Sequence, residues 1–594
     1  MLTETASGRS GLAYISLAAI GLMWTLPFLY YQHGLPITTF YQEWGAAMLG
    51  LCGMLLLLTR RYWLQPEIPR IVLLPIILML LVLLQALLGR MAYFSHALLT
   101  SLYLLWAGLL MMLGQRLRRE FDLPTLVVAL AAILLAGAEL GTLAGILQHY
   151  RWPTLLNQVV AGKAGTTVVG NMGQPNHFAN YTTLGLISLG LLHVRGKLGA
   201  WLVAILAAPM LFVLVLSGSR SVWVYLAALC GLAYLWQRGN KPMRRLLVYC
   251  VLLLVGFGLM HLLAQVSWMA GVNGNQTTLD RFASQVGSSS IRLHIWYEAW
   301  LIFKQFPLLG AGFGQFAYQH FLLGPQLHAT YIYGLYNNAH NLVMQTAAEM
   351  GLAGLLAWLG TLALWIRQAA RAPRTVDHWW GYAILAVLGI HSLLEYPLWY
   401  AYFIGIAALL LGVFDNTTFR LELRNAGRLS VASILLLGAL SLTQLWQSYR
   451  ALEHLRALRP TSATDTVYTQ RIREGLVAAH AQALLQPYAE LVMSSLIEAG
   501  TEHLAEKRAL NENAMRFVPI GSVVYRQALL LALAGDLPAA QLQIERAIWA
   551  FPTDFPLVRE QLRTLAQKDP LHFSALLEFA LRKNEEYQLA IRTR

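Results

Sequence analysis

Residues 123–147 read LPTLVVALAAILLAGAELGTLAGIL, an apolar run in which Glu139 is the charged residue. A helix of about 20 apolar residues is long enough to cross the hydrocarbon core of a bilayer. Similar runs recur through the first three quarters of the chain. Of its 594 residues, 57% are hydrophobic and 12% are charged, and the mean hydropathy is +0.52. Because about a quarter of the residues in a soluble domain are charged, the sequence predicts an all-α integral membrane protein.

The apolar runs divide the chain into thirteen predicted transmembrane helices. They cover residues 11–31, 40–58, 71–89, 95–114, 123–147, 170–193, 199–216, 221–237, 245–264, 340–366, 379–393, 398–414 and 429–446. We expect residues 1–446 to form a polytopic membrane catalytic domain with a large loop at 265–339. Residues 447–594 are more charged and helical in period, and we expect them to form a separate soluble domain.

Lys and Arg gather in alternate loops between the predicted spans, for example Arg420, Arg424 and Arg428 between the last two. Cytoplasmic loops carry this excess, so we interpret the formal charge of +14 as a topology signal rather than a nucleic-acid-binding patch. The pattern predicts a cytoplasmic N-terminus and, in a bacterium, a multi-pass inner-membrane protein. The loop at 265–339 and the tail would then be periplasmic.

The tail contains a segment typical of a tetratricopeptide repeat. From Tyr525 to Pro552, two helical stretches are joined by a Gly-Asp turn, and the second ends at a proline. Stacked helix pairs of this kind form concave surfaces that bind peptides. The alternative is a helical cap without a binding partner.

Polar residues unusual for a membrane protein lie in loops that the charge pattern assigns to the outer side. The longest polar interruption, residues 265–351, contains Arg281, Arg292 and His340, together with a glycine-rich turn at 310–314. Arg220 opens the predicted span at 221–237. An arginine there is typical of an anion site or a substrate pathway, but also of an interfacial residue whose charge reaches water. A lone His before a span is also common as a cap.

Two further outer segments are rich in hydrogen-bonding groups. The stretch GNMGQPNHFAN at 170–180 contains Gln174, Asn176 and His177, and the short loop at 394–400 contains Glu395 and Tyr396. Amide side chains beside an apolar helix need hydrogen-bond partners if they are buried. They are consistent with the wall of a polar pocket or with a simple loop and helix cap.

Together these groups suit displacement of a pyrophosphate leaving group. Arginine can bind phosphate oxygens in a bidentate manner and stabilise the charge that develops there. A neutral His can accept the proton of an attacking hydroxyl. The outer segments contain neither an Asp-x-Asp pair nor a His/Cys cluster that would indicate a divalent metal site, so we expect a reaction without metal or cofactor.

These motifs resemble the bacterial O-antigen ligase/polymerase (WaaL/Wzy) superfamily, and most closely its protein O-oligosaccharyltransferases of the PglL type. The resemblance rests on Gly173–Ala179, the Ser-Arg-Ser at 219–221, Arg292 with its Trp, the glycine-rich run at 307–314, and Asn338–Asn341. It implies a glycosyltransferase of the C-type (GT-C) fold that transfers an oligosaccharide en bloc from undecaprenyl-pyrophosphate. The acceptors would be Ser or Thr hydroxyls of periplasmic proteins such as pilin.

The resemblance also implies roles for single residues. His340 would be the base, Arg220 and Arg292 would bind the pyrophosphate, and Gln174 and Tyr396 would lie in the site. We add Asn176, His177, Arg281 and Glu395 as candidate substrate-binding residues. Two alternatives stay open: an O-antigen ligase or polymerase that acts on lipid-linked glycan, and a transporter or flippase for an anionic lipid.

Overall fold

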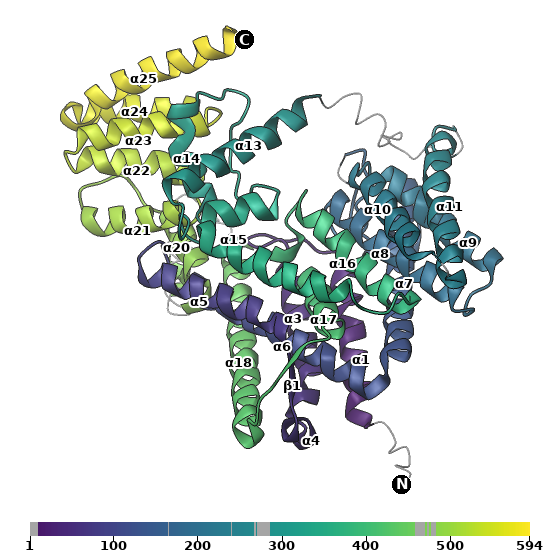
Figure 1. Cartoon of the computed structure of the whole chain (residues 1–594). Helices are drawn as coiled ribbons and strands as arrows, with labels where there is room; N and C mark the ends of the chain where they lie inside the picture. The colour runs from purple at the N-terminus through teal and green to yellow at the C-terminus, as the bar shows by residue number, and fades with distance from the viewer. Residues whose placement is uncertain are drawn as a thin grey trace. The chain divides into compact units, whose positions relative to one another are not determined.

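The computed structural model describes residues 10–163, 165–238, 240–266, 269, 286–457, 470–471, 474–476 and 483–593. Nearly all of its regular structure is α-helix, as the sequence predicted (Figure 1). Within these residues a single two-stranded antiparallel sheet pairs β1 (Glu67–Pro69) with β2 (Thr418–Arg420). Its register aligns Ile68 with Phe419, which joins two loops that are far apart in the sequence.

The helices follow one another along the chain with short connections. They are α1 (Gly11–Met23), α2 (Leu26–Leu29), α3 (Phe40–Met54), α4 (Arg60–Leu64), α5 (Leu73–Leu87), α6 (Phe94–Phe121), α7 (Leu123–Tyr150), α8 (Pro175–Val194), α9 (Ala200–Leu216), α10 (Ser221–Trp236), α11 (Lys241–Leu263), α13 (Val286–Gln305), α14 (Phe316–Leu327), α15 (Leu342–Ala369), α16 (Val376–Ser392), α17 (Ala401–Val413), α18 (Arg424–Ala457), α20 (Gln486–Ser495), α21 (Leu504–Phe517), α22 (Gly521–Leu533), α23 (Leu537–Ala550), α24 (Phe555–Lys568) and α25 (Pro570–Arg592). Short 3-10 turns lie at η1 (Leu55–Leu58), η2 (Arg70–Val72), η3 (Leu155–Val159), η5 (Pro397–Trp399) and η6 (Ala483–Leu485).

Each of the thirteen predicted spans coincides with helix. Eight helices of the described part are long and apolar enough to cross a membrane: Gly11–Leu29, Phe40–Leu58, Arg70–Leu87, Phe94–Phe121, Leu123–Tyr150, Lys241–Leu263, Leu342–Ala369 and Arg424–Leu455. The other five predicted spans coincide with α8, α9, α10, α16 and α17, which are shorter or less apolar. The chain is therefore an all-α membrane protein, and the count of thirteen spans stays a prediction.

The helices form two compact units. The first contains Met1–Ile77, Leu102–Val286 and Ala357–Leu442, and the second contains Leu78–Ser101, Gly287–Leu356 and Thr443–Arg594. The long helices α5, α6, α15 and α18 contribute to both. The second unit combines the tail with part of the loop predicted at 265–339. The predicted domain boundary between residues 446 and 447 stays a prediction.

The first unit is built around α7 and α8. A Cβ at Gly137 would lie 2.1 Å from the Tyr181 hydroxyl oxygen, and one at Gly185 would lie 2.3 Å from Ala138 Cβ. Small residues at such positions let two membrane helices approach closely and gain van der Waals contact. Nearly every side chain of α8 is buried as a result, which fixes the polar residues at its first turn.

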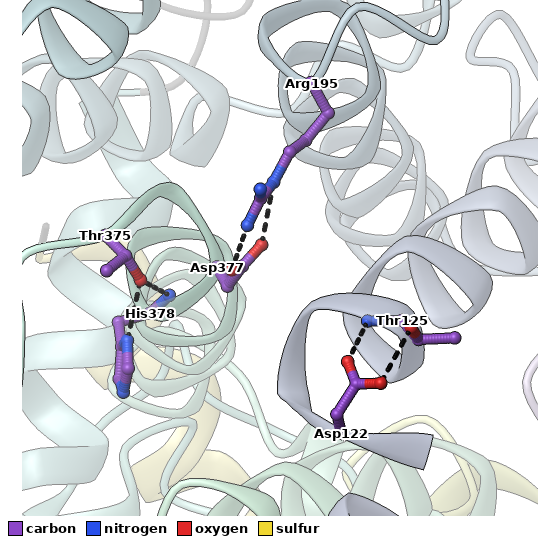
Figure 2. Close-up of polar contacts among 6 residues, drawn as sticks. All are labelled: Asp122, Thr125, Arg195, Thr375, Asp377 and His378. Atoms are coloured by element: carbon purple, nitrogen blue, oxygen red, sulfur yellow. Dashed lines mark hydrogen bonds and ion pairs between the residues drawn. The ribbon is translucent and has the colours of Figure 1, made fainter. Parts of the chain in front are cut away.

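Helix α8 is antiparallel to α16 and is bonded to it near both ends. After the last turn of α8, Arg195 Nε donates to Asp377 Oδ1 at 3.1 Å, and a second guanidinium nitrogen bonds Oδ2 (Figure 2). At the other end, Asn176 Nδ2 donates to Glu395 Oε1 at 2.8 Å. Figure 2 also shows Thr375 and Asp122 capping the first turns of α16 and α7. The ion pair therefore fixes the register that places Asn176 beside Glu395.

The second unit contains the helix pairs of the tail. The predicted helix–turn–helix at Tyr525–Pro552 is present as α22 and α23, joined through Gly535 with φ +77°. Further pairs are α20 with α21 and α24 with α25, and they stack along one direction (Figure 1). Helix α14 from the loop packs against α21 and α23, and its Phe321 is buried in the same apolar core. The likeness to tetratricopeptide repeats stays a prediction.

Candidate functional site

The glycine-rich turn after α13 is bonded to a break in α15. Helix α15 is interrupted at Gly351, which has φ +61° and ψ −155°. Backbone hydrogen bonds join the two segments: Ala311 N to Ala348 O at 2.9 Å, Gly312 N to Glu349 O at 3.1 Å, and Leu352 N to Pro307 O at 2.8 Å. The break frees these carbonyls from the helix and turns them into acceptors for the neighbouring loop.

Glycine is required where the two segments touch. A Cβ at Gly310 would lie 2.1 Å from the carbonyl carbon of Glu349, and one at Gly351 would lie 2.6 Å from Gly310 N. The buried Glu349 carboxylate accepts a hydrogen bond from Phe316 N at 3.0 Å at the start of α14. Gln85 of α5 donates to Glu349 O at 2.7 Å and accepts from Phe313 N at 3.0 Å. This junction therefore fixes α13 and α14 on α15.

His340 lies two residues before α15 in a backbone of fixed shape. Its φ is +51°, in the left-handed region that His tolerates better than most residues. Its amide donates to Asn338 Oδ1 at 2.8 Å, and the preceding Ala339 amide donates to Gln345 Oε1 at 2.6 Å. The orientation of the imidazole is thus determined by a short turn with side-chain acceptors on both sides.

Helix α13 carries Arg292 toward this turn. Trp296 Nε1 donates to Ala339 O at 2.9 Å, directly before His340. Arg292 precedes Trp296 by four residues, and residues four apart lie on one face of a helix. The face of α13 that bears Arg292 is therefore the face bonded to the His340 turn.

The tail holds the segment that leads into His340. Gly334 N donates to Ala550 O of α23 at 2.7 Å, and the His328 ring lies edge-on to Trp549 at 4.6 Å between centroids. These contacts lie six to twelve residues before His340. They give the tail a structural role in addition to any role in acceptor binding.

A buried carboxylate between two imidazoles was not foreseen from the sequence. Glu298 on α13 bonds His294 Nε2 at 3.2 Å and His320 Nδ1 of α14 at 2.8 Å, and Tyr331 Oη bonds His294 Nδ1 at 3.0 Å. Burial alone would raise the pKa of Glu298, but the hydrogen bonds and charges of His294 and His320 outweigh it and lower that pKa below 4.5. The network connects α13, α14 and the segment that precedes His340.

We expect Glu298→Gln to destabilise the protein by about 1–3 kcal/mol at pH 7, because the amide cannot accept both imidazole hydrogen bonds. Since the folded pKa is depressed, the carboxylate stabilises the fold above its unfolded value near 4.5, and that contribution is lost as pH falls through the folded pKa. Thermal unfolding of both proteins between pH 3.5 and 7 measures the difference, which should shrink at the acidic end.

Glu506→Gln is the matched control, because Glu506 forms a similar pair with His503 at 3.2 Å on an exposed surface. This control should change the unfolding temperature little, since exposed pairs contribute little. An equal effect of the two substitutions would show that the buried network does not stabilise the second unit.

In the first unit, the structure brings together five of the residues that the sequence singled out. Gln174 caps α8 by accepting a hydrogen bond from His177 N, and Asn176 is bonded to Glu395. The buried His177 ring lies 6.4 Å from the Tyr396 ring. Burial raises the pKa of the Tyr396 hydroxyl, which therefore stays protonated and can donate a hydrogen bond.

The remaining predicted residues are distributed as follows. Arg292 and His340 belong to the second unit, and Arg220 is the half-buried N-cap residue of α10 in the first. Arg281 lies outside the described residues. Within the described ranges, no group of three or more His, Cys, Asp or Glu residues has an arrangement that could hold a metal ion.

Comparison with protein families gives three matches along the chain. Residues 184–359 match the family described as "O-Antigen ligase", and residues 379–565 match "Virulence factor membrane-bound polymerase, C-terminal". Residues 168–193, which include Gln174, Asn176 and His177, match "Protein glycosylation ligase". The second of these regions extends from α16 into α24 of the tail.

Two proteins of Acinetobacter baylyi are similar to this chain. A "General O-oligosaccharyltransferase" is 27% identical over 467 residues, which cover 77% of this chain and 79% of that protein. A "ComP-specific O-oligosaccharyltransferase" is 27% identical over 262 residues, or 42% of this chain and 44% of that protein. The chain belongs to the bacterial protein O-oligosaccharyltransferases of the PglL type, within the O-antigen ligase/polymerase superfamily.

Proposed function

We propose that this membrane glycosyltransferase moves an oligosaccharide en bloc from undecaprenyl-pyrophosphate to Ser or Thr hydroxyls of periplasmic proteins, with pilin as the expected type of acceptor. Its similarity to two O-oligosaccharyltransferases supports a lipid-linked donor and a protein acceptor. We further propose a C-type glycosyltransferase fold in the bacterial inner membrane. The alternating basic loops support a cytoplasmic N-terminus with the loop and tail in the periplasm.

The observation that carries this proposal is the bond from Trp296 to the peptide before His340. It turns the face of α13 that bears Arg292 toward the turn that bears His340. In the proposed reaction the acceptor oxygen bonds to the anomeric carbon of the glycan, and His340 takes the hydroxyl proton. The bond from that carbon to the pyrophosphate breaks, and Arg292 stabilises the charge on the departing phosphate oxygens.

We propose that the other polar residues bind or position the substrates. Arg220 binds the pyrophosphate in this proposal, and Arg281, Gln174 and Tyr396 contact the donor or the acceptor. Asn176, Glu395 and His177 take part through the polar wall that they form together, because the first two are bonded to each other and the third is buried. Since arginine supplies the positive charge, we propose that transfer needs no metal, and EDTA should leave the rate unchanged.

The test of this function uses cells that make a lipid-linked glycan and contain both a pilin acceptor and lipid A core. Expression of the chain should add glycan to pilin, seen as a mass increase of the intact protein. The matches to an O-antigen ligase and a membrane-bound polymerase favour the alternative in which glycan is joined to another lipid or glycan. Glycosylated lipopolysaccharide with unmodified pilin would overturn the proposal in favour of that alternative.

We expect Arg292→Lys to lower the transfer rate by about 10- to 100-fold, although it keeps the positive charge. Lysine lacks the planar fork that binds two phosphate oxygens at once. Arg371→Lys is the matched control, because Arg371 is exposed in a loop that the charge pattern assigns to the cytoplasm. Initial rates with purified donor and pilin measure the effect, and near-normal activity of the Arg292 variant would exclude bidentate phosphate binding.

A further inference from the structure

An apolar groove opens in the first unit between α5, α6 and α18. It has a volume of about 230 Å³, and its lining includes Val72, Pro75, Gly108, Met112, Gly427 and Val431. Apart from Ser430, every lining side chain is apolar. The groove exists because two glycines face it: a Cβ at Gly108 would meet Pro75 Cγ only at 3.5 Å.

Two arginines lie at one end of the groove on the same face of α18. Arg424 precedes Gly427 by three residues, and Arg428 precedes Val431 by three, so each lies one turn before a lining residue. Both are exposed. Within the described ranges, neither forms an ion pair with a carboxylate. The groove is therefore apolar along its length and cationic at its mouth.

The surrounding loops strengthen this positive charge. Pairing of β1 with β2 brings Arg70 over the Phe419 ring at 5.4 Å, next to Arg420. Glu67 is already paired with Arg119. The Asp415 carboxylate accepts hydrogen bonds from Ile71 N and Thr417 N. Glu422 remains to offset one charge, so the arginines at this end outnumber the available carboxylates.

We propose that the groove binds one acyl chain of an anionic phospholipid, whose phosphate is held by Arg424 and Arg428. An apolar slot beside arginines on membrane helices matches an amphiphile with an acidic headgroup, and guanidinium groups bind phosphate oxygens in a bidentate manner. The basic-loop pattern assigns these arginines to the side opposite His340, which favours a bilayer phospholipid over the glycan donor. The site does not depend on the proposed transfer reaction.

The test uses the full chain in nanodiscs that contain phosphatidylglycerol or phosphatidylcholine with identical acyl chains. Native mass spectrometry after release counts the lipids that stay bound. The wild type should retain phosphatidylglycerol preferentially and should unfold at a higher temperature in its presence. The double variant Arg424→Gln/Arg428→Gln should bind phosphatidylglycerol roughly tenfold more weakly or worse. Both positions are on the surface, so the fold should be unaffected.

Filling the groove should have the same effect through its apolar part. Gly108→Leu places a side chain where the acyl chain would lie, and Ala426→Phe narrows the groove from an exposed position that tolerates bulk. Gly360→Leu is the matched control, because Gly360 is exposed on α15 and a Cβ there meets nothing within 4 Å. It should retain the lipid as the wild type does.

Three results would overturn the proposal. The first is equal retention of the two phospholipids by the wild type, which would indicate only the ordinary lipid layer around a membrane protein. The second is equal lipid loss in the Gly360 and groove variants. The third is recovery of an isoprenoid diphosphate from cell-derived protein as the lipid that the arginine variant loses, which would assign the groove to the glycan donor.

Discussion

Replacing His340 with asparagine is expected to lower glycan transfer by about 10²–10⁴-fold, the usual contribution of a general base, while binding of the lipid-linked donor is retained. Asparagine suits this test because it tolerates the left-handed backbone that His340 adopts at φ +51°. It removes the imidazole and preserves the turn. Single-turnover transfer rates and donor binding to the purified protein separate the two effects.

His503→Asn is the matched control for this experiment. His503 has the same φ of +51° and lies exposed at the start of α21 in the tail. It should transfer glycan at the wild-type rate. If the His340 variant kept normal transfer, His340 would be a turn residue and not a base. A transporter or flippase would likewise be indifferent to the loss of a base, so this result would also favour that alternative.

Gly310→Ala is expected to prevent correct folding of the second unit and to abolish transfer. The added Cβ would lie 2.1 Å from Glu349 C and 2.3 Å from Met350 N. These are backbone atoms that cannot move aside without breaking the bonds between the turn and α15. The cost should exceed the roughly 1–2 kcal/mol of left-handed strain alone. Yield, monodispersity and unfolding temperature of the purified protein measure it.

Gly89→Ala separates strain from overlap. Gly89 has the same φ of +69° as Gly310, lies in the same unit, and would place its Cβ in open space. It should lower the unfolding temperature only slightly and leave transfer intact. If the two alanine variants behaved alike, the close contact between the glycine-rich turn and Glu349 would not hold the loop.

Much of the architecture could be predicted because a bilayer imposes one rule on every spanning segment. Each crossing needs an apolar helix of sufficient length, so hydropathy alone located all thirteen helical segments. Local signals also sufficed for the α22–α23 pair, whose turn contains Gly535 and Asp536. The sequence likewise pointed to Arg292 on a helix and to His340 just before one.

The Glu298 network shows where local signals end. His294 and Glu298 are four residues apart on one helix, a spacing that could have indicated their contact. His320 and Tyr331 lie on other segments, and nothing in their spacing predicts that they meet. Gln85 gave a weaker signal as a lone amide in an apolar run, but its acceptor and donor partners lie more than 200 residues away.

The sequence by itself determined the class of protein, its helical segments, the candidate chemical groups and the family, because apolar periodicity and short motifs are local properties of the chain. Tertiary structure decided what those motifs do. It showed that the glycine-rich run is a junction with the broken helix α15, that the tail supports the segment before His340, and that Asn176 meets Glu395. Such pairings depend on backbone groups left free by a helix break and on the register between distant helices, and neither is encoded in residue spacing.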